Sequence, residues 1–165
     1  AVWLLVSRSL QQTHMQITQL SPTADAAVRF FVLPDPTNID QLGAQLTEVG
    51  HFILPDLTFE AGSATLDGDT FPSLQTLAEF LSKKPDQSIV LVGHTDSSGS
   101  HDKNLELSKE RAQAVQSMLL AQFPNIQSER VTSEGLGYFA PVASNSSLEG
   151  REMNRRVEVV LIPTD

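Results

Sequence analysis

Two histidines and two aspartates fall within nine positions of the chain: His94, Asp96, His101 and Asp102. Side chains of these types can bind a metal ion, assist hydrolysis or hold a charged ligand. Their spacing differs from the His-Glu-x-x-His pattern that fixes two zinc ligands on one helical face. No Gly-x-Ser-x-Gly elbow accompanies the serines of this stretch. Solvated loops also collect His and Asp for other reasons. A metal-dependent or wall-modifying hydrolase using His94, Asp96 and His101 is therefore kept only as an alternative.

A second interpretation starts from Asp96 and Arg111. In a helical segment, Asn104 and Arg111 lie seven residues apart and therefore about 20° from alignment around the axis, with Leu107 between them on the same stripe. The loop that ends at Asn104 brings Asp96 back over the start of this helix. A carboxylate and a guanidinium facing each other across a shallow pocket suit a ligand with both an ammonium and a carboxylate, such as an amino-acid head. The competing interpretation is an internal Asp96–Arg111 salt bridge that only braces the loop.

Alternating strands and helices are expected to position these residues. We predict helices over 69–85 and 104–123, and strands over 53–63, 88–93, 130–137 and 154–163. The run "SIVLVG" at 88–93 is typical of a strand covered on both faces. The loop 94–103 leaves its carboxyl end, where such sheets commonly place ligands. This order of elements predicts an α/β (α+β) fold, a mixed sheet with helices packed on it.

The long helix has apolar or small residues at intervals of three and four. The spacing predicts one buried stripe, made of Leu105, Ser108, Ala112, Val115 and Leu119. Arg111 borders this stripe, so we expect it at the rim of the core.

Residues 1–50 differ from the rest of the chain. They contain an expected strand at 28–34 and a helical pattern at 39–49 that Gly50 ends. We treat 1–50 as an N-terminal strand–helix extension without an assigned role, and 51–165 as the main domain. No apolar run approaches the ~18–20 residues of a membrane-spanning helix.

Composition narrows the function classes. The 165 residues are 40% hydrophobic and 19% charged, as in ordinary globular proteins. The formal net charge of −9 argues against nucleic acid as a partner, because neutralising phosphates needs clustered Lys and Arg. The same charge disfavours docking on an anionic membrane surface. With no cysteine, the chain has no disulfide, thiolate zinc site or cysteine nucleophile.

Four motifs resemble the OmpA-like C-terminal domain, which also occurs in peptidoglycan-associated lipoproteins and flagellar stator proteins. They are "GHTDSSG" (93–99), "NLELSKERA" (104–112), "GLGYFAPVASN" (135–145) and "GREMNRRVEV" (150–159), in the family's order. A weaker match, "LTFEAGSATL" (57–66), looks like the family's first strand and turn. The resemblance covers about residues 51–162 and implies a β-α-β-α-β-β mixed sheet.

The resemblance implies non-catalytic binding of peptidoglycan through the diaminopimelate of its stem peptide. The family's ligand-binding positions fall on Asp96, Arg111, Asn104 and Leu107, with Arg155 of the Asn-Arg-Arg motif and Thr95 as further candidates. His94 is a loop-shaping residue in this reading, without a ligand role. No cofactor and no metal site are expected.

The resemblance also implies a place in the cell envelope. We expect a periplasmic protein, tethered to the outer or inner membrane through an anchor upstream of Ala1. Envelope proteins or a second copy of the chain are possible further partners. A third reading is an envelope assembly subunit that has the fold but binds mainly protein partners.

Overall fold

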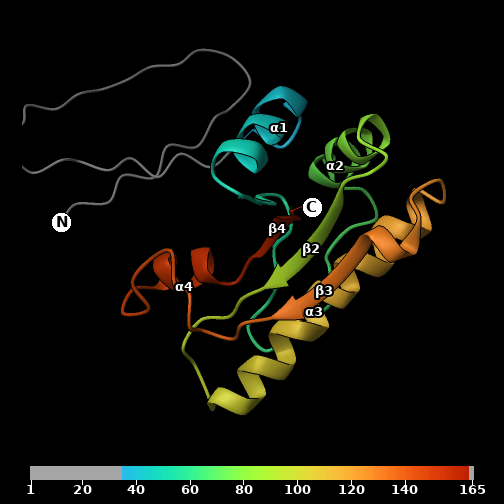
Figure 1. The fold of residues 1–165 in the computed structure, drawn as a ribbon. Coiled ribbons are helices and arrows are strands. Elements are labelled where there is room, and N and C mark those ends of the chain that lie inside the picture. The colour runs from blue at the N-terminus through green and yellow to red at the C-terminus, as the bar shows by residue number, and fades with distance from the viewer. Residues whose placement is uncertain (1–34, 164–165) are drawn as a thin grey trace, which may run out of the picture. The chain divides into compact units, whose positions relative to one another are not determined.

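The computed structural model describes residues 35–163 (Figure 1). The strand expected at 28–34 lies outside the described residues. The helices are α1 (Ile39–Glu48), α2 (Pro72–Lys83), α3 (His101–Gln122) and α4 (Leu148–Asn154), with a single 3₁₀ turn at Ser128–Arg130. The strands are β1 (His51–Ile53), β2 (Ser88–Gly93), β3 (Val131–Gly135) and β4 (Val157–Ile162).

The four strands form one mixed sheet in the order β1-β4-β2-β3. β4 runs antiparallel to both β1 and β2, whereas β2 and β3 are parallel. Parallel neighbours need a long crossover, and α3 is that crossover: it packs against β2 and β3 and lies partly behind β3 in Figure 1. The predicted fold class, a mixed sheet with helices packed on it, is confirmed.

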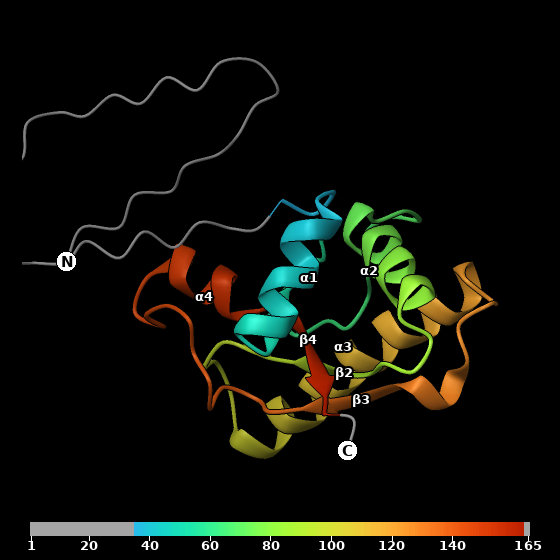
Figure 2. The ribbon, with the colours of Figure 1, turned by 45° about the horizontal axis from the view of Figure 1, so that its top comes forward.

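The core lies between one face of the sheet and helices α1, α2 and α3. β2 shows why: Ile89, Leu91 and Gly93 are buried, whereas the residues between them are only half-buried. The prediction that this strand is covered on both faces is therefore wrong, because the helices cover a single face. α1, which falls within the 1–50 segment, packs against α2, β1 and β4 (Figure 2) and buries Leu42 and Leu46 in the same core.

Three predicted strands have different bounds in the structure, and the strand expected over 130–137 is only slightly shorter, at Val131–Gly135. The strand expected over 53–63 is only His51–Ile53. Leu54 still donates to the Val157 carbonyl, but Pro55 has no backbone N–H to continue the ladder. The strand expected from residue 154 begins at Val157, because α4 occupies the residues before it. The Ser147 side chain caps α4 by accepting a hydrogen bond from the Gly150 N–H.

α3 also departs from the prediction in two places. It begins at His101 rather than at Asn104, with Ser100 as its N-cap. Leu105, expected in the buried stripe, is 42% exposed because it lies at the margin of the stripe in the first turns of the helix. Ser108, Ala112, Val115 and Leu119 are fully buried as predicted.

Two glycines let α3 approach the sheet closely. A Cβ atom at Gly93 would lie 1.9 Å from the Ser108 carbonyl oxygen, and one at Gly135 would lie 2.4 Å from the Lys109 nitrogen. These glycines stand opposite each other in the parallel pair of β2 and β3. Backbone approach of this kind requires glycine. It sets the height of α3 above the sheet and with it the position of Arg111. Within the described residues, no helix is both long and apolar enough to cross a membrane.

Candidate functional site

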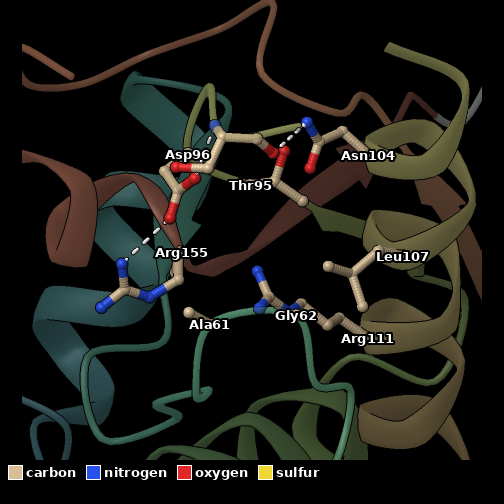
Figure 3. Close-up of a pocket in the computed structure, with 9 residues that line it drawn as sticks. Ala61, Gly62, Thr95, Asp96, Asn104, Leu107, Arg111 and Arg155 are labelled. Atoms are coloured by element: carbon tan, nitrogen blue, oxygen red, sulfur yellow. Dashed lines mark hydrogen bonds and ion pairs between the residues drawn. The ribbon is translucent and has the colours of Figure 1, made fainter. Parts of the chain in front are cut away.

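A small pocket of about 60 Å³ opens where the loop after β2 meets the first turns of α3 (Figure 3). Four segments contribute to it: the irregular chain after β1, the loop after β2, one side of α3 and the residue that ends α4. The lining residues are Ala61, Gly62, Thr95, Asp96, Ser98, Asn104, Leu107, Arg111 and Arg155. All six residues singled out from the sequence are therefore brought to one pocket.

Asp96 is the acidic group of the pocket and is 6% exposed. Its Oδ1 accepts a hydrogen bond from the Ser98 N–H at 2.8 Å, and its Oδ2 accepts one from Arg155 Nη1 at 3.0 Å. Burial by itself raises the pKa of this carboxyl group. The hydrogen bonds from Ser98 and the charge of Arg155 outweigh burial and hold the pKa below its ordinary value. Asp96 is therefore ionised at neutral pH.

The ion-pair partner of Asp96 is Arg155, not Arg111. Arg155 follows directly on α4, and its Nε donates to the Phe59 carbonyl at 3.2 Å. Figure 3 shows its guanidinium turned towards the carboxylate, with the interaction drawn as a dashed line. The loop-bracing salt bridge that the sequence left open as Asp96–Arg111 is thus made by a residue 59 positions from Asp96.

Arg111 is a buried cation held by main-chain oxygens. It is 1% exposed. Its Nε, Nη1 and Nη2 donate to the carbonyls of Ser63, His94 and Glu60 at 2.9, 3.1 and 2.9 Å. The guanidinium carbon also lies 5.0 Å from the centre of the Phe59 ring. Burial, and then the nearby charge of Arg155, lower its pKa to about 10, so Arg111 stays protonated.

The remaining pocket residues shape the walls. Asn104 Nδ2 donates to the Ser98 carbonyl at 2.9 Å and so fastens the loop to α3. The Thr95 N–H donates to the Gly137 carbonyl at 2.9 Å. The Thr95 hydroxyl is buried and finds no hydrogen-bond partner among the described residues. Leu107 supplies an apolar surface facing Arg111 (Figure 3).

These groups retain unused hydrogen-bonding capacity. A guanidinium has five N–H donors and an ionised carboxylate about four acceptor sites. Arg111 uses three donors, Arg155 two, and each carboxylate oxygen of Asp96 accepts one bond. The pocket therefore presents free acceptor sites and free cationic donors to the same small volume. That is the requirement for holding a group that carries both charges.

The residues of the hydrolase alternative have separate surroundings. His94 is 2% exposed, with Nε2 3.8 Å from Glu158 Oε2. The ring of His101 packs on those of Tyr138 and Phe139. Asp96 is bonded to Ser98 and Arg155. Among residues 35–163, no group of three or more His, Asp or Glu side chains is arranged to hold a metal ion.

Sequence reasoning missed three lining residues, Ala61, Gly62 and Ser98. Ala61 and Gly62 lie in the segment "LTFEAGSATL", the weaker family match, in which the sequence pattern assigns no residue to the site. Gly62 has a φ of +74°, a conformation that favours glycine. The turn it makes carries the Glu60 and Ser63 carbonyls to Arg111.

The comparison with protein families agrees with the fold and the motifs. The model of the OmpA family matches residues 58–155. The chain belongs to the OmpA family.

Individual relatives and structures are similar over roughly two thirds or more of the chain. "Probable lipoprotein YiaD" of Escherichia coli (strain K12) is 38% identical over 125 residues, which are 73% of this chain and 56% of that protein. "Peptidoglycan-binding protein ArfA" of Mycobacterium tuberculosis is 35% identical over 105 residues, 64% of this chain and 32% of that protein. The crystal structure of the peptidoglycan-associated lipoprotein from Burkholderia pseudomallei matches with a TM-score of 0.58 at 27% identity, covering 64% of this chain and 88% of that one. The chain thus spans between about a third and just over half of the two curated relatives.

Proposed function

We propose that this chain is a non-catalytic module that binds peptidoglycan in the pocket around Asp96, through the diaminopimelate of the stem peptide. One observation carries the proposal: an ionised, buried carboxylate and two guanidinium groups with unused hydrogen-bonding capacity line the same small pocket. Membership of the OmpA family supports it, as do similar proteins whose names state an association with peptidoglycan.

The free end of diaminopimelate is an amino-acid head with one ammonium and one carboxylate. In the proposed complex the ammonium donates to Asp96, whose oxygens each have room for a further bond. The carboxylate accepts hydrogen bonds from the remaining N–H groups of Arg111 and Arg155. A carboxylate is planar, and this shape matches the planar guanidinium group. Leu107 packs against the methylene groups between the head and the peptide. The Thr95 hydroxyl, buried without a partner among the described residues, is available to the same ligand.

The affinity of one site for one stem peptide is expected to be modest, because few ligand atoms fit a pocket of about 60 Å³. A wall polymer presents the same stem many times. Tethering the module near it, or pairing two modules, raises the effective concentration and hence the avidity.

The test is a calorimetric titration with a soluble, diaminopimelate-containing tetrapeptide stem. Asp96→Asn removes the charge and keeps the shape, so we expect about a tenfold or larger loss of affinity. Asp102→Asn is the matched control, since Asp102 is an exposed aspartate in the first turn of α3 and does not line the pocket. Equal affinities for the wild type and Asp96→Asn would contradict the proposal.

A second titration tests the choice of diaminopimelate. A lysine-containing stem has the ammonium but lacks the second carboxylate, so the wild type should bind it more weakly. Arg155→Ala should remove most of that discrimination. Arg155 is more informative than Arg111, because Arg111→Ala also leaves three main-chain carbonyls without their donor. If both stems bind equally, the diaminopimelate assignment fails while binding to peptidoglycan stands.

A periplasmic location, with attachment to the outer or inner membrane, is part of the same proposal. The relatives named as lipoproteins support it. Recovery of the protein in the cytoplasmic fraction of its host would contradict the location. Release of soluble fragments from purified sacculi by the protein would contradict the non-catalytic role.

A further inference from the structure

An aromatic cluster of two half-buried rings and one exposed ring lies beside the first turn of α3 and has no part in the pocket. The rings of His101 and Phe139 are 4.4 Å apart between centroids and tilted by 35°, so they are partly stacked. Tyr138 meets both edge-on, at 5.3 Å from Phe139 and 5.7 Å from His101. Phe139 is nevertheless 67% exposed. One face of its ring is supported by His101, and much of the ring remains open to solvent.

The cluster and the pocket are built on the same two segments. Gly137, directly before Tyr138, accepts the hydrogen bond from the Thr95 N–H of the pocket wall. A Cβ atom on Gly137 would lie 3.4 Å from the Leu105 nitrogen, so this chain passes against the start of α3. Figures 1 and 2 show the connection from β3 to α4 leaving the sheet at this end of the helix.

Helical geometry places the two sites on either side of α3. At 100° per residue, His101 and Leu107 are each about 60° from Asn104, in opposite directions. Leu107 lines the pocket, and His101 belongs to the cluster. A ligand that reached both would therefore cross roughly one helix diameter, about 10 Å.

The surface of this aromatic cluster suits stacking against a sugar ring better than it suits a protein interface. Its members are three rings and two exposed leucines, Leu105 and Leu136, and none of them carries a fixed charge. A stable protein interface uses about 20–30 residues on each side, far more than these five. A flat, neutral ring face matches the C–H face of a pyranose in size, and dispersion and apolar burial favour that contact.

We propose that the His101–Tyr138–Phe139 cluster stacks against a sugar ring of the glycan strand of peptidoglycan. The module then holds two chemically different parts of one polymer: the stem peptide in the pocket and the glycan on the aromatic cluster. The proposal rests on the proposed function of the pocket for the identity of the polymer. It adds a carbohydrate subsite that uses none of the pocket residues.

The experiment compares two soluble ligands, the free tetrapeptide stem and the same stem attached to its disaccharide. The wild type should bind the disaccharide-bearing ligand about three- to tenfold more tightly. Phe139→Ala should abolish this advantage and leave the affinity for the free stem unchanged. Phe139→Trp should retain the advantage, whereas Phe139→Leu, which is apolar but has no ring, should lose it. Val49→Ala, a matched loss of a 61% exposed apolar side chain at the C-cap of α1, should change neither affinity.

Several results would overturn the proposal. These are equal affinities of the wild type for the two ligands, an equal effect of Phe139→Ala on both, or wild-type behaviour of Phe139→Leu. The last result would indicate a general apolar contact, as in a docking site for another protein.

Failure of the pocket assignment is distinguishable from failure of the subsite. If the free stem does not bind at all, the proposed function of the pocket is wrong. A soluble N-acetylglucosamine tetramer then tests the cluster alone, by saturation transfer from the aromatic protons to the sugar protons. Transfer in the wild type that is lost in Phe139→Ala supports the subsite, and absence of transfer in the wild type overturns it.

Discussion

Arg155 and Arg156 are neighbours in the chain, yet they form two different kinds of ion pair. Arg155 bonds Asp96 at 3.0 Å, and both line the pocket. Arg156 bonds Glu158 Oε1 through Nε at 2.7 Å, in a cluster that also contains His94 and His51. The first pair opens on a hollow that can admit a ligand. The second, which we call the enclosed pair, is similarly buried but does not line this pocket, and Arg156 also donates to the Ala140 carbonyl at 3.0 Å.

The difference separates the pair that we propose to bind a ligand from one that we expect to be structural, although the residue types are the same. A carboxylate that borders a pocket can exchange water for a ligand group. Glu158, on strand β4, pairs with Arg156 and lies close to two histidines, so we expect it to stabilise the sheet. His94, the most conspicuous residue of the "GHTD" motif, belongs to the enclosed cluster, because its ring lies 3.8 Å from Glu158 and is 2% exposed.

The largest difference is expected when each arginine is removed in turn. Arg156→Ala leaves Glu158 charged and buried, and losing one partner of a buried ion pair costs about 3–5 kcal/mol. Arg155→Ala should cost clearly less, since Asp96 keeps the Ser98 N–H and can be reached by water from the pocket. Urea unfolding at neutral pH measures both. In ligand titrations the order should reverse, with Arg155→Ala the more damaging of the two at temperatures where both variants are folded.

A double variant controls the interpretation of this result. Arg156→Ala combined with Glu158→Gln removes both charges of the enclosed pair, so it should recover part of the stability lost in Arg156→Ala alone. Equal losses of stability in Arg155→Ala and Arg156→Ala would remove the distinction between the two pairs.

The two regions should also respond to acid in different pH windows. Burial, and then the positive charge of Arg156, lower the pKa of His94 from its ordinary 6.5 to about 4 in the folded protein. Between these values the unfolded chain takes up a proton that the folded chain does not. The free energy of unfolding therefore falls as the pH falls through this window, by about 2 kcal/mol at pH 5 from this group.

Asp96 contributes in the same sense as His94, but at lower pH. Its folded pKa lies below the ordinary 3.8, so its contribution is present above that value and is lost as the pH falls through the folded pKa. Urea unfolding at about pH 7.5 and about pH 5 should therefore show a difference that His94→Gln largely removes and Asp96→Asn retains. A difference unchanged in His94→Gln would assign the pH dependence to other groups.

Much of this arrangement could be predicted from local pattern. The helical periodicity of residues 72–83 and 101–122, and the apolar run of β2, identify elements whose packing faces are visible in the sequence. The seven-residue spacing of Asn104 and Arg111 is enough to bring both to one side of α3, and both line the pocket.

The partners of these residues could not be predicted in the same way. The pairing of Asp96 with Arg155 depends on α4, a seven-residue helix with a glycine in it that is too short to show a periodic pattern. Arg111 is satisfied by carbonyls of the irregular chain after β1, and the position of a carbonyl leaves no trace in side-chain types. One-sided burial of β2 follows from how many helices pack on the sheet, which is a property of the whole fold.

The smallest effect tests how firmly the open region is held. Asn104 fastens the loop to α3 through one amide hydrogen bond to the Ser98 carbonyl, and Ser98 in turn donates its N–H to Asp96. Asn104→Ala should cost about 1 kcal/mol of stability, the usual contribution of one such bond, and should also weaken binding of the stem peptide, because Asp96 is held less well.

Gln122→Ala is the matched control, an amide at the other end of the same helix that donates to the Asp69 carbonyl at 2.6 Å. It should lower stability by a similar or smaller amount and leave binding unchanged. If Gln122→Ala weakened binding as much as Asn104→Ala, the loss would reflect general loosening of α3. If instead only Asn104→Ala weakens binding, the open pair depends on its own loop, independently of the enclosed cluster on the sheet.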